Sequence, residues 1–149
     1  MTVKTFPLAL LSLVAAACVS NPVKRDPPPM PFVGTKWMLV TERKVEGEQP
    51  HLEFGDGAVS GSTGWNRIMG RYVQDSIGAG AIIFSSIAST KRYCADSLMA
   101  IEDKVLGVLR SSTNVRVTGN RLRIDGSAGA LDFVADATGP VTPPPTTRP

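Results

Sequence analysis

Hydrophobic residues in the middle of this chain recur mainly at every second position, and this pattern limits its fold more than any other feature. Alternation over about four to eight residues is typical of β-strands with one buried face. The alternating runs are Trp37–Thr41, Leu52–Phe54, Ile82–Ile87, Val115–Val117, Leu122–Ile124 and Leu131–Phe133. Turn sequences stand at Gly55-Asp56-Gly57, Gly78-Ala79-Gly80, Gly119-Asn120 and Asp125-Gly126. Because such turns connect hairpins, we predict an antiparallel sheet.

One segment has the spacing of a helix instead. Its apolar residues recur at intervals of three and four, at Leu98, Ile101, Val105, Val108 and Leu109. Asp96 or Ser97 can cap its start, and Asp103, Lys104 and Arg110 should face water. A lone amphipathic helix must bury its apolar stripe against the sheet. We therefore predict a mainly β fold of about seven antiparallel strands, with this helix between the fifth and sixth strands, where it covers an open side of the sheet or the end of a barrel.

Prolines divide the chain into a folded middle and two extended ends. Five of the twelve prolines lie within residues 19–33 and five within 137–149, with Pro50 alone between these segments. Proline fixes φ and removes a backbone donor, so we expect residues 18–33 to form a tether and 137–149 a disordered tail, neither joining the fold. The predicted domain, residues 34–136, carries twelve Lys and Arg against twelve Asp and Glu. This balance argues against a nucleic-acid-binding surface.

The first residues have the layout of a secretory signal peptide over 1–17, with Lys4 before the apolar stretch Phe6–Ala17. The sequence Ala15-Ala16-Ala17-Cys18 resembles the lipobox of bacterial lipoproteins. That resemblance implies cleavage before Cys18 and a lipid anchor on its thiol, with the membrane as partner. An ordinary signal peptide followed by a chance Cys is the alternative. Val19 replaces the Asp that holds some lipoproteins at the inner membrane, so we expect outer-membrane placement facing the periplasm.

Two short stretches resemble the signatures of META domains, the HslJ-like (DUF306) lipoproteins of bacteria. The first runs from Ser60 to Gly70 and contains Gly64-Trp65-Asn66-Arg67, and the second runs from Thr90 to Cys94, before the helix with Glu102. The resemblance implies a small antiparallel barrel or half-barrel filled on one side by a helix, often tethered to an envelope membrane. It also implies links to heat shock and antibiotic tolerance, with no shared reaction or ligand.

This chain departs from the family pattern at one position of the first signature. Trp65 stands where many members have Cys. If the two family cysteines pair, that disulfide cannot form here. With Cys18 lipidated, Cys94 has no intramolecular partner and is expected to be a free thiol.

The candidate site residues each have a structural and a functional interpretation. Asn66 is expected to lock a strand corner by bonding to nearby backbone groups, with ligand contact as the alternative. Trp65 is expected to fill the core in place of the family Cys, with an exposed contact residue as the alternative. Gly64, Gly70, Thr90 and Cys94 are taken as structural members of the two signatures.

No catalytic constellation is evident. Thiol catalysis at Cys94 needs a base, and His51, the one histidine, is expected in a solvated loop. Asp96, Glu102 and Asp103 are explained as a cap and a solvated helix face. One His and two Cys are too few for a protein-only zinc site, so we expect no metal, no cofactor and no enzymatic activity.

The remaining candidates concern partners. Arg116, Arg121 and Arg123 should share one face of a hairpin, which is either solvated or binds an anionic partner such as lipid headgroups or lipopolysaccharide. We expect a monomeric, non-catalytic interaction module that supports envelope integrity or stress tolerance. The alternative is a lipid- or small-ligand-binding barrel, which needs a cavity lined by Leu39, Phe54, Ile83 and Phe133.

Overall fold

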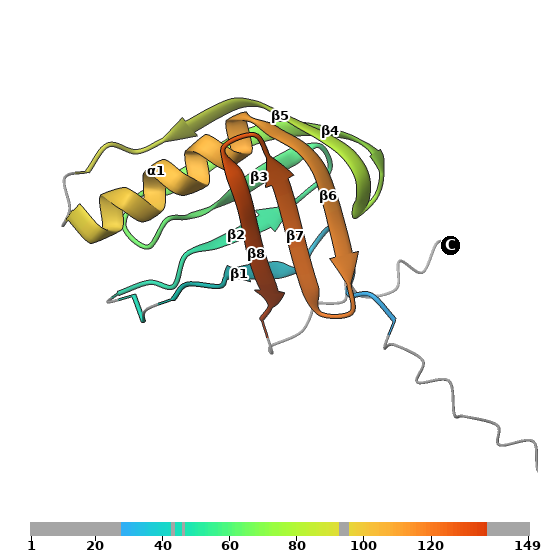
Figure 1. Ribbon diagram of the computed structural model, residues 1–149, viewed down its shortest axis with the longest axis horizontal. Helices are drawn as coiled ribbons and strands as arrows, with labels where there is room; N and C mark the ends of the chain where they lie inside the picture. The colour runs from blue at the N-terminus through green and yellow to red at the C-terminus, as the bar shows by residue number, and fades with distance from the viewer. Residues whose placement is uncertain (1–27, 43, 46, 93–95, 137–149) are drawn as a thin grey trace, which may run out of the picture.

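The computed structural model describes residues 28–42, 44–45, 47–92 and 96–136, and its strands close into an antiparallel β-barrel (Figure 1). Each strand pairs with its neighbours in the chain, and the last strand closes on the first. The elements are β1 (Lys36–Leu39), β2 (His51–Phe54), β3 (Ala58–Ser62), β4 (Arg67–Ser76), β5 (Ala79–Ser89), α1 (Asp96–Arg110), β6 (Ser112–Thr118), β7 (Arg121–Gly126) and β8 (Gly129–Ala135). The predicted antiparallel barrel with one helix after the fifth strand is confirmed, with eight strands where about seven were predicted.

Strands β3 and β4 are the part of the barrel that alternation alone did not reveal. Val59, Ile68 and Tyr72 point into the core. Small residues and exposed apolar residues stand between them, including Met69 at 61% exposure and Val73 at 73%. Because both faces of β4 carry apolar side chains, the period of two is obscured in the sequence.

Helix α1 covers one side of the barrel, where it contacts β5, β7 and β8 (Figure 1). Val105, Val108 and Leu109 are buried as predicted. Leu98 and Ile101 are only half-buried, because the N-terminal half of the helix lies beside an open groove. The stripe predicted from the spacing therefore seals the barrel through its C-terminal half.

The predicted tether does not extend to Val33, because residues 30–32 belong to the fold. Phe32 is 3% exposed, and its ring stacks on Phe54 with centroids 4.2 Å apart. The Met30 amide donates to the carbonyl of Gly119, and the indole of Trp37 donates to the carbonyl of Phe32. The prolines around Phe32 led to the prediction of an extended tether, but burial of this one aromatic ring brings residues 30–32 into the fold.

The aromatic centre of the barrel contains one ionisable group, the phenol of Tyr72. Its ring meets Phe32 and Phe54 edge-on, and its hydroxyl donates to the carbonyl of Gly55 over 2.6 Å. Burial raises the pKa of Tyr72 above its ordinary 10.0, the charge of Asp56 raises it further, and a hydrogen bond with the Gly57 backbone opposes both. The folded protein therefore holds this proton more tightly than the unfolded chain does.

We predict a loss of stability at alkaline pH that depends on Tyr72. A pKa that is raised on folding gives stability that is complete below the unfolded value, 10.0, and declines as the pH rises past it. Tyr72→Phe should cost about 1 kcal/mol at neutral pH through the lost hydrogen bond, and should flatten the alkaline decline. Urea unfolding across pH measures the cost at neutral pH and the alkaline decline. The parent and the variant both keep Tyr93, so the difference between them reports on Tyr72. Equal alkaline slopes would contradict the assignment.

Candidate functional site

The first family signature forms a tight corner between β3 and β4. The backbone amide of Asn66 donates to the Thr63 hydroxyl, and that hydroxyl donates to the Asn66 carbonyl. Gly64 has φ +99°, and a Cβ there would lie 3.1 Å from the carbonyl oxygen of Glu48. Glycine is therefore required at this position by both conformation and space.

Asn66 uses the whole hydrogen-bonding capacity of its side chain within the protein. The residue is 1% exposed. Its oxygen accepts from the Thr90 hydroxyl at 3.1 Å and from the Arg92 amide at 2.9 Å. Its nitrogen donates to the Arg92 carbonyl at 3.3 Å and to Oε2 of Glu102 at 2.6 Å. Two donors and two acceptor sites are thus filled, so Asn66 acts as a structural lock with no capacity left for a ligand.

Glu102 of α1 is the buried charge to which this lock attaches. It is 7% exposed, so the expectation that it lies on a solvated helix face is wrong. Oε2 accepts from Asn66, and Oε1 accepts from the Ser89 hydroxyl at 2.6 Å. Both carboxylate oxygens have short, charge-assisted bonds, which allows the group to be buried.

The second signature meets the first through Thr90. Besides donating to Asn66, the Thr90 hydroxyl accepts the amide of Arg67 at 3.0 Å, and the Thr90 amide donates to the Arg67 carbonyl. The ends of β4 and β5 and one turn of α1 are thereby held together. We call Asn66, Ser89, Thr90 and Glu102 the corner lock.

Sequence reasoning did not identify the roles of Ser89, Arg92 and Glu102. For Glu102 the sequence did contain a usable signal. It lies four residues after Leu98, three before Val105 and seven before Leu109, so it falls on the apolar stripe of the helix. A carboxylate at such a position requires a buried partner, and Asn66 supplies it.

Gly70 has a packing role in the same signature. It pairs with Val59 of β3. A Cβ at this position would collide with the side chain of Ile87 on β5. The absence of a side chain therefore lets Ile87 cross over β4 beside the corner.

Trp65 is not a core filler, and that expectation is wrong. Its side chain projects from the corner with 42% exposure, and the guanidinium carbon of Arg92 lies 4.8 Å from its ring centroid. The side chain of Asn66 points inward, whereas that of Trp65, the residue before it, points outward. Asn66 also bonds to the amide and the carbonyl of Arg92, so it holds the backbone from which this guanidinium extends toward the ring.

The cysteine and histidine candidates do not form a described pair. His51 is 6% exposed on β2, not in a solvated loop, and its Nδ1 lies 3.0 Å from the Gln49 carbonyl. On β2, His51 pairs with Met38 of β1 and with Ser62 of β3. Cys18 and Cys94 lie outside the described residues, so the lipid anchor and the free thiol stay predictions.

The three arginines of the proposed anionic-partner face are exposed on β6 and β7. Arg116 lies directly opposite Arg123, and Arg121 lies opposite Thr118. Arg123 bonds to both oxygens of Asp132 and to Asp125, each at 2.9 Å. The hydrogen bonds and charges of Asp132, followed by those of Asp125, raise the pKa of Arg123. Arg123 is thus compensated, which leaves Arg116 and Arg121 as the cations of this face.

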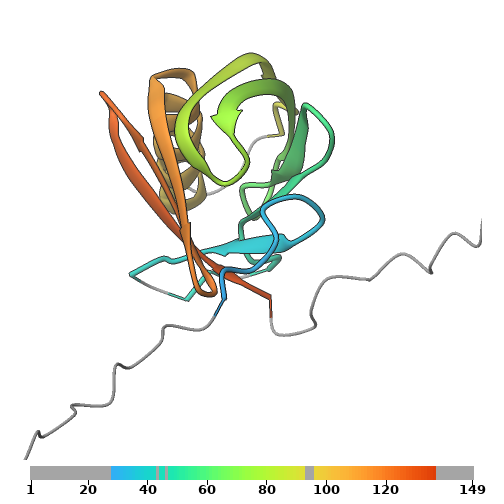
Figure 2. The same ribbon diagram turned by 90° about the vertical axis from the view of Figure 1, so that its right-hand side faces the viewer.

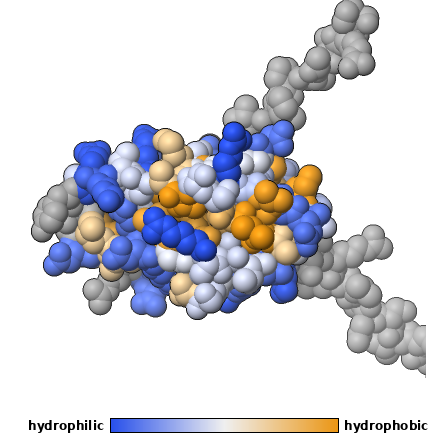
Figure 3. Space-filling view, turned by 90° about the horizontal axis from the view of Figure 1, so that it is seen from above, coloured by the Kyte–Doolittle hydropathy of each residue, from blue (hydrophilic) through white to orange (hydrophobic). Residues whose placement is uncertain are grey.

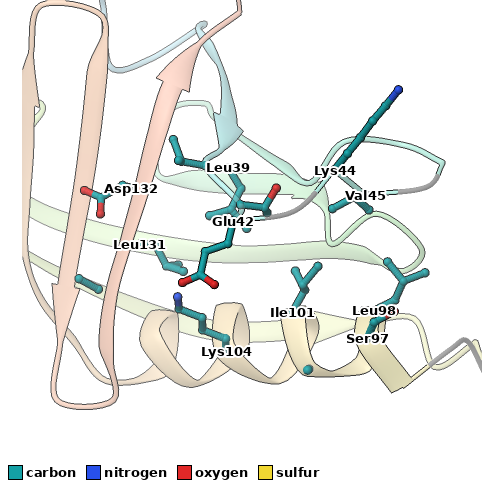
Figure 4. Close-up of a pocket in the computed structure, with 14 residues that line it drawn as sticks. Leu39, Glu42, Lys44, Val45, Ser97, Leu98, Ile101, Lys104, Leu131 and Asp132 are labelled. Carbon is teal, nitrogen blue, oxygen red and sulfur yellow. The ribbon is translucent and has the colours of Figure 1, made fainter.

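A groove of about 950 Å³ lies outside the barrel, between the segment after β1, the first half of α1 and the start of β8 (Figure 4). Its apolar lining includes Leu39, Leu98, Ile101 and Leu131. Charged residues surround this lining, and Glu42 and Lys104 point toward each other across it (Figure 4).

The four residues expected to line an interior cavity do not share one. Leu39, Phe54 and Phe133 pack in the continuous core, while Ile83 is 67% exposed on the outer surface of β5. Within the described residues, no cluster of His, Cys, Asp and Glu could hold a metal ion. The described part of the chain also contains no helix long and apolar enough to cross a membrane.

Comparison with protein families matches residues 31–138 to the META domain. The chain belongs to the META domain family. The match begins beside Phe32, in agreement with the burial of that residue. The matched residues include every strand of the barrel, the helix and both signatures.

Two solved NMR structures share the fold of this META domain. One has a TM-score of 0.56 and 21% identity, covering 68% of this chain and 88% of the other. The second, a protein from Burkholderia xenovorans, has a TM-score of 0.53 and 22% identity, covering 83% of this chain and 99% of its own. A comparison with curated proteins finds no match.

We predict that Asn66→Ala destabilises the META domain by about 3 kcal/mol or more, because it leaves the buried Glu102 carboxylate without one of its donors. Glu102→Ala should cost a similar amount. The double variant should cost less than the sum of the two, because each substitution removes the same contact. Urea unfolding of all three proteins measures the coupling. Strict additivity would show that the two side chains act independently.

Trp65→Ala is the matched control at the adjacent position. It removes a larger side chain than Asn66→Ala does, yet it should cost about 1 kcal/mol or less, because the ring is partly exposed and its contact with Arg92 is weak. A buried aromatic would cost about 3 to 5 kcal/mol. A loss in that range would show that Trp65 fills the core after all.

Proposed function

We propose that this protein is a bacterial envelope lipoprotein, anchored through Cys18, whose META domain is a non-catalytic interaction module in envelope integrity or stress tolerance. The observation that carries the proposal is the corner lock. Its polar groups, which would be the candidates for chemistry, are consumed by bonds to one another and to neighbouring backbone. Among the described residues, the corner lock therefore has a structural role, which favours a function carried by the surface around it.

The surface that it supports is the pair formed by Trp65 and Arg92. Trp and Arg are the residue types that most often dominate the energy of protein interfaces. Here the ring is 42% exposed, and Asn66 holds the backbone that carries the cation beside it. A pre-ordered contact loses little entropy on binding, which favours recognition of a partner. We propose that an envelope protein or polymer binds at this pair.

Outer-membrane placement facing the periplasm is part of the proposal. Its support is the lipobox-like sequence before Cys18 and the Val that follows it. Two or three acyl chains on one Cys would give stable anchoring, because each buried CH₂ contributes about 0.8 kcal/mol. The META domain would then be displayed on a segment that enters the fold at Met30.

A second candidate function is binding of a lipid or small ligand. The filled barrel interior argues against an internal site, whereas the groove beside α1 offers a site on the outside of the barrel. Its apolar floor and charged border suit an amphipathic molecule. Weakened ligand binding after Ile101→Lys, with the fold intact, would favour this function.

The anchoring is tested by Cys18→Ser. The substitution removes the thiol that would carry the lipid, so the protein should leave the membrane fraction or accumulate unprocessed. Membrane fractionation and mass measurement of the mature chain give the result. A mature parent chain whose mass includes no acyl groups would refute the lipoprotein assignment.

The interaction is tested by crosslinking in intact cells followed by purification of the protein. Trp65→Ala should remove a specific crosslinked species while the unfolding midpoint stays nearly unchanged. Met99→Ala is the control, because Met99 is also an exposed large side chain, at 37%, on the solvent side of α1. Loss of the same species from both variants, or from neither, would exclude Trp65 as the contact.

A further inference from the structure

The outer face of the hairpin formed by β4 and β5 is unusually apolar. Val73 and Ile83 are directly paired across the two strands and are 73% and 67% exposed. Met69, further back on β4, is 61% exposed, and Ile77 in the turn is 77% exposed. Figure 3 looks down on the side where these strands run and shows apolar residues gathered on it. We call Met69, Val73, Ile77 and Ile83 the hairpin face.

Cations border this face. Arg71 lies between Met69 and Val73 in the outward positions of β4, and Arg116 of β6 lies opposite Ala79 of β5. The two hairpin strands and their turn contain one carboxylate, Asp75. Arg121, on the next strand, is also exposed. An apolar patch beside several cations and one anion is complementary to an anionic interface with an apolar interior.

The chain enters the fold at the end of the barrel where this hairpin turns (Figure 2). Met30 bonds to Gly119, and Gly78 of the hairpin turn bonds to Val117. Phe32 packs on that turn, since a Cβ at Gly78 would lie 3.1 Å from the Phe32 Cβ. The described chain therefore begins beside the tip of the hairpin face.

The length of chain before this point limits how far the domain can lie from its anchor. Twelve residue steps separate Cys18 from Met30, so they span at most roughly 40 Å. The ten residues of β4 extend roughly 30 Å from the tip toward the corner lock. An anchor at Cys18 thus holds Met30, and with it the hairpin tip, within reach of the bilayer.

We propose that the hairpin face docks on an anionic phospholipid bilayer, with Val73, Ile77 and Ile83 entering the interface and Arg71 and Arg116 contacting headgroup phosphates. Only the argument from tether length rests on the proposed anchoring, because the composition of the face is independent of it. A second copy of the chain is disfavoured as the occupant, since a two-fold interface would bring the Arg71 side chains of both copies to one patch.

The test is co-sedimentation of residues 19–149, which contain every described residue, with vesicles. Vesicles of phosphatidylcholine alone are compared with vesicles that contain phosphatidylcholine and phosphatidylglycerol in a two-to-one ratio. We expect binding to the mixed vesicles, with a fall of roughly tenfold or more at high salt because the headgroup attraction is screened. Equal binding to both kinds of vesicle, or no binding to either, would overturn the proposal.

Variants locate the binding surface. Val73→Thr with Ile77→Ser and Ile83→Thr keeps β-compatible residues in the strands and should reduce the bound fraction roughly tenfold. Arg71→Gln with Arg116→Gln should abolish the preference for phosphatidylglycerol. The control, Met99→Ser, removes an exposed apolar group elsewhere and should bind as the parent does. Unfolding midpoints confirm that each variant is folded.

Two further outcomes are distinguishable. If ultracentrifugation without vesicles shows that the parent is a dimer and the hairpin variant a monomer, the face is an interface between copies and the lipid proposal is wrong. If vesicle binding holds while the mass of the mature parent chain includes no acyl groups, only the anchoring proposal fails. If anchoring holds and the parent does not bind vesicles, only the hairpin-face proposal fails.

Discussion

The buried contact between Asn66 and Glu102 is the interaction on which the arrangement of the site depends. It joins the corner before β4 to the helix, which is thirty-six residues away in the chain. A carboxylate at 7% exposure is costly unless its oxygens are satisfied, and the Asn66 amide and Ser89 hydroxyl satisfy one oxygen each. The same amide orders Arg92, so one side chain determines both how the helix is seated and what the corner presents to solvent.

The sequence predicts the barrel well because its information is local. Alternation at Leu122 and Ile124, and turn residues such as Gly119-Asn120, report directly on strands and hairpins. The C-terminal half of the helical stripe is likewise local, since Val105, Val108 and Leu109 lie on one face of any helix that forms. These predictions need no knowledge of distant residues.

The site was harder to predict because its partners come together only in the folded chain. Glu102 was interpreted by its residue type, although its position on the apolar stripe indicated burial. Trp65 was assigned to the core for its size, but the direction of a corner side chain depends on what its neighbour must reach. Phe32 shows the same limit, because it is buried against Phe54, a ring that short-range patterns do not bring near it.

The order of strands around the barrel has a consequence for how the domain assembles. Seven of the eight pairings join strands that follow one another in the chain, and the eighth, between β1 and β8, joins residues nearly one hundred positions apart. Hairpins can form early because closing a short loop costs little entropy, whereas the β1 and β8 ladder must wait for both ends of the domain. That ladder spans three residue pairs, and β1 follows directly on the segment that carries Phe32. Ring closure therefore takes place where the chain leaves its N-terminal tether, so a pull on that tether acts first on the ladder that forms last.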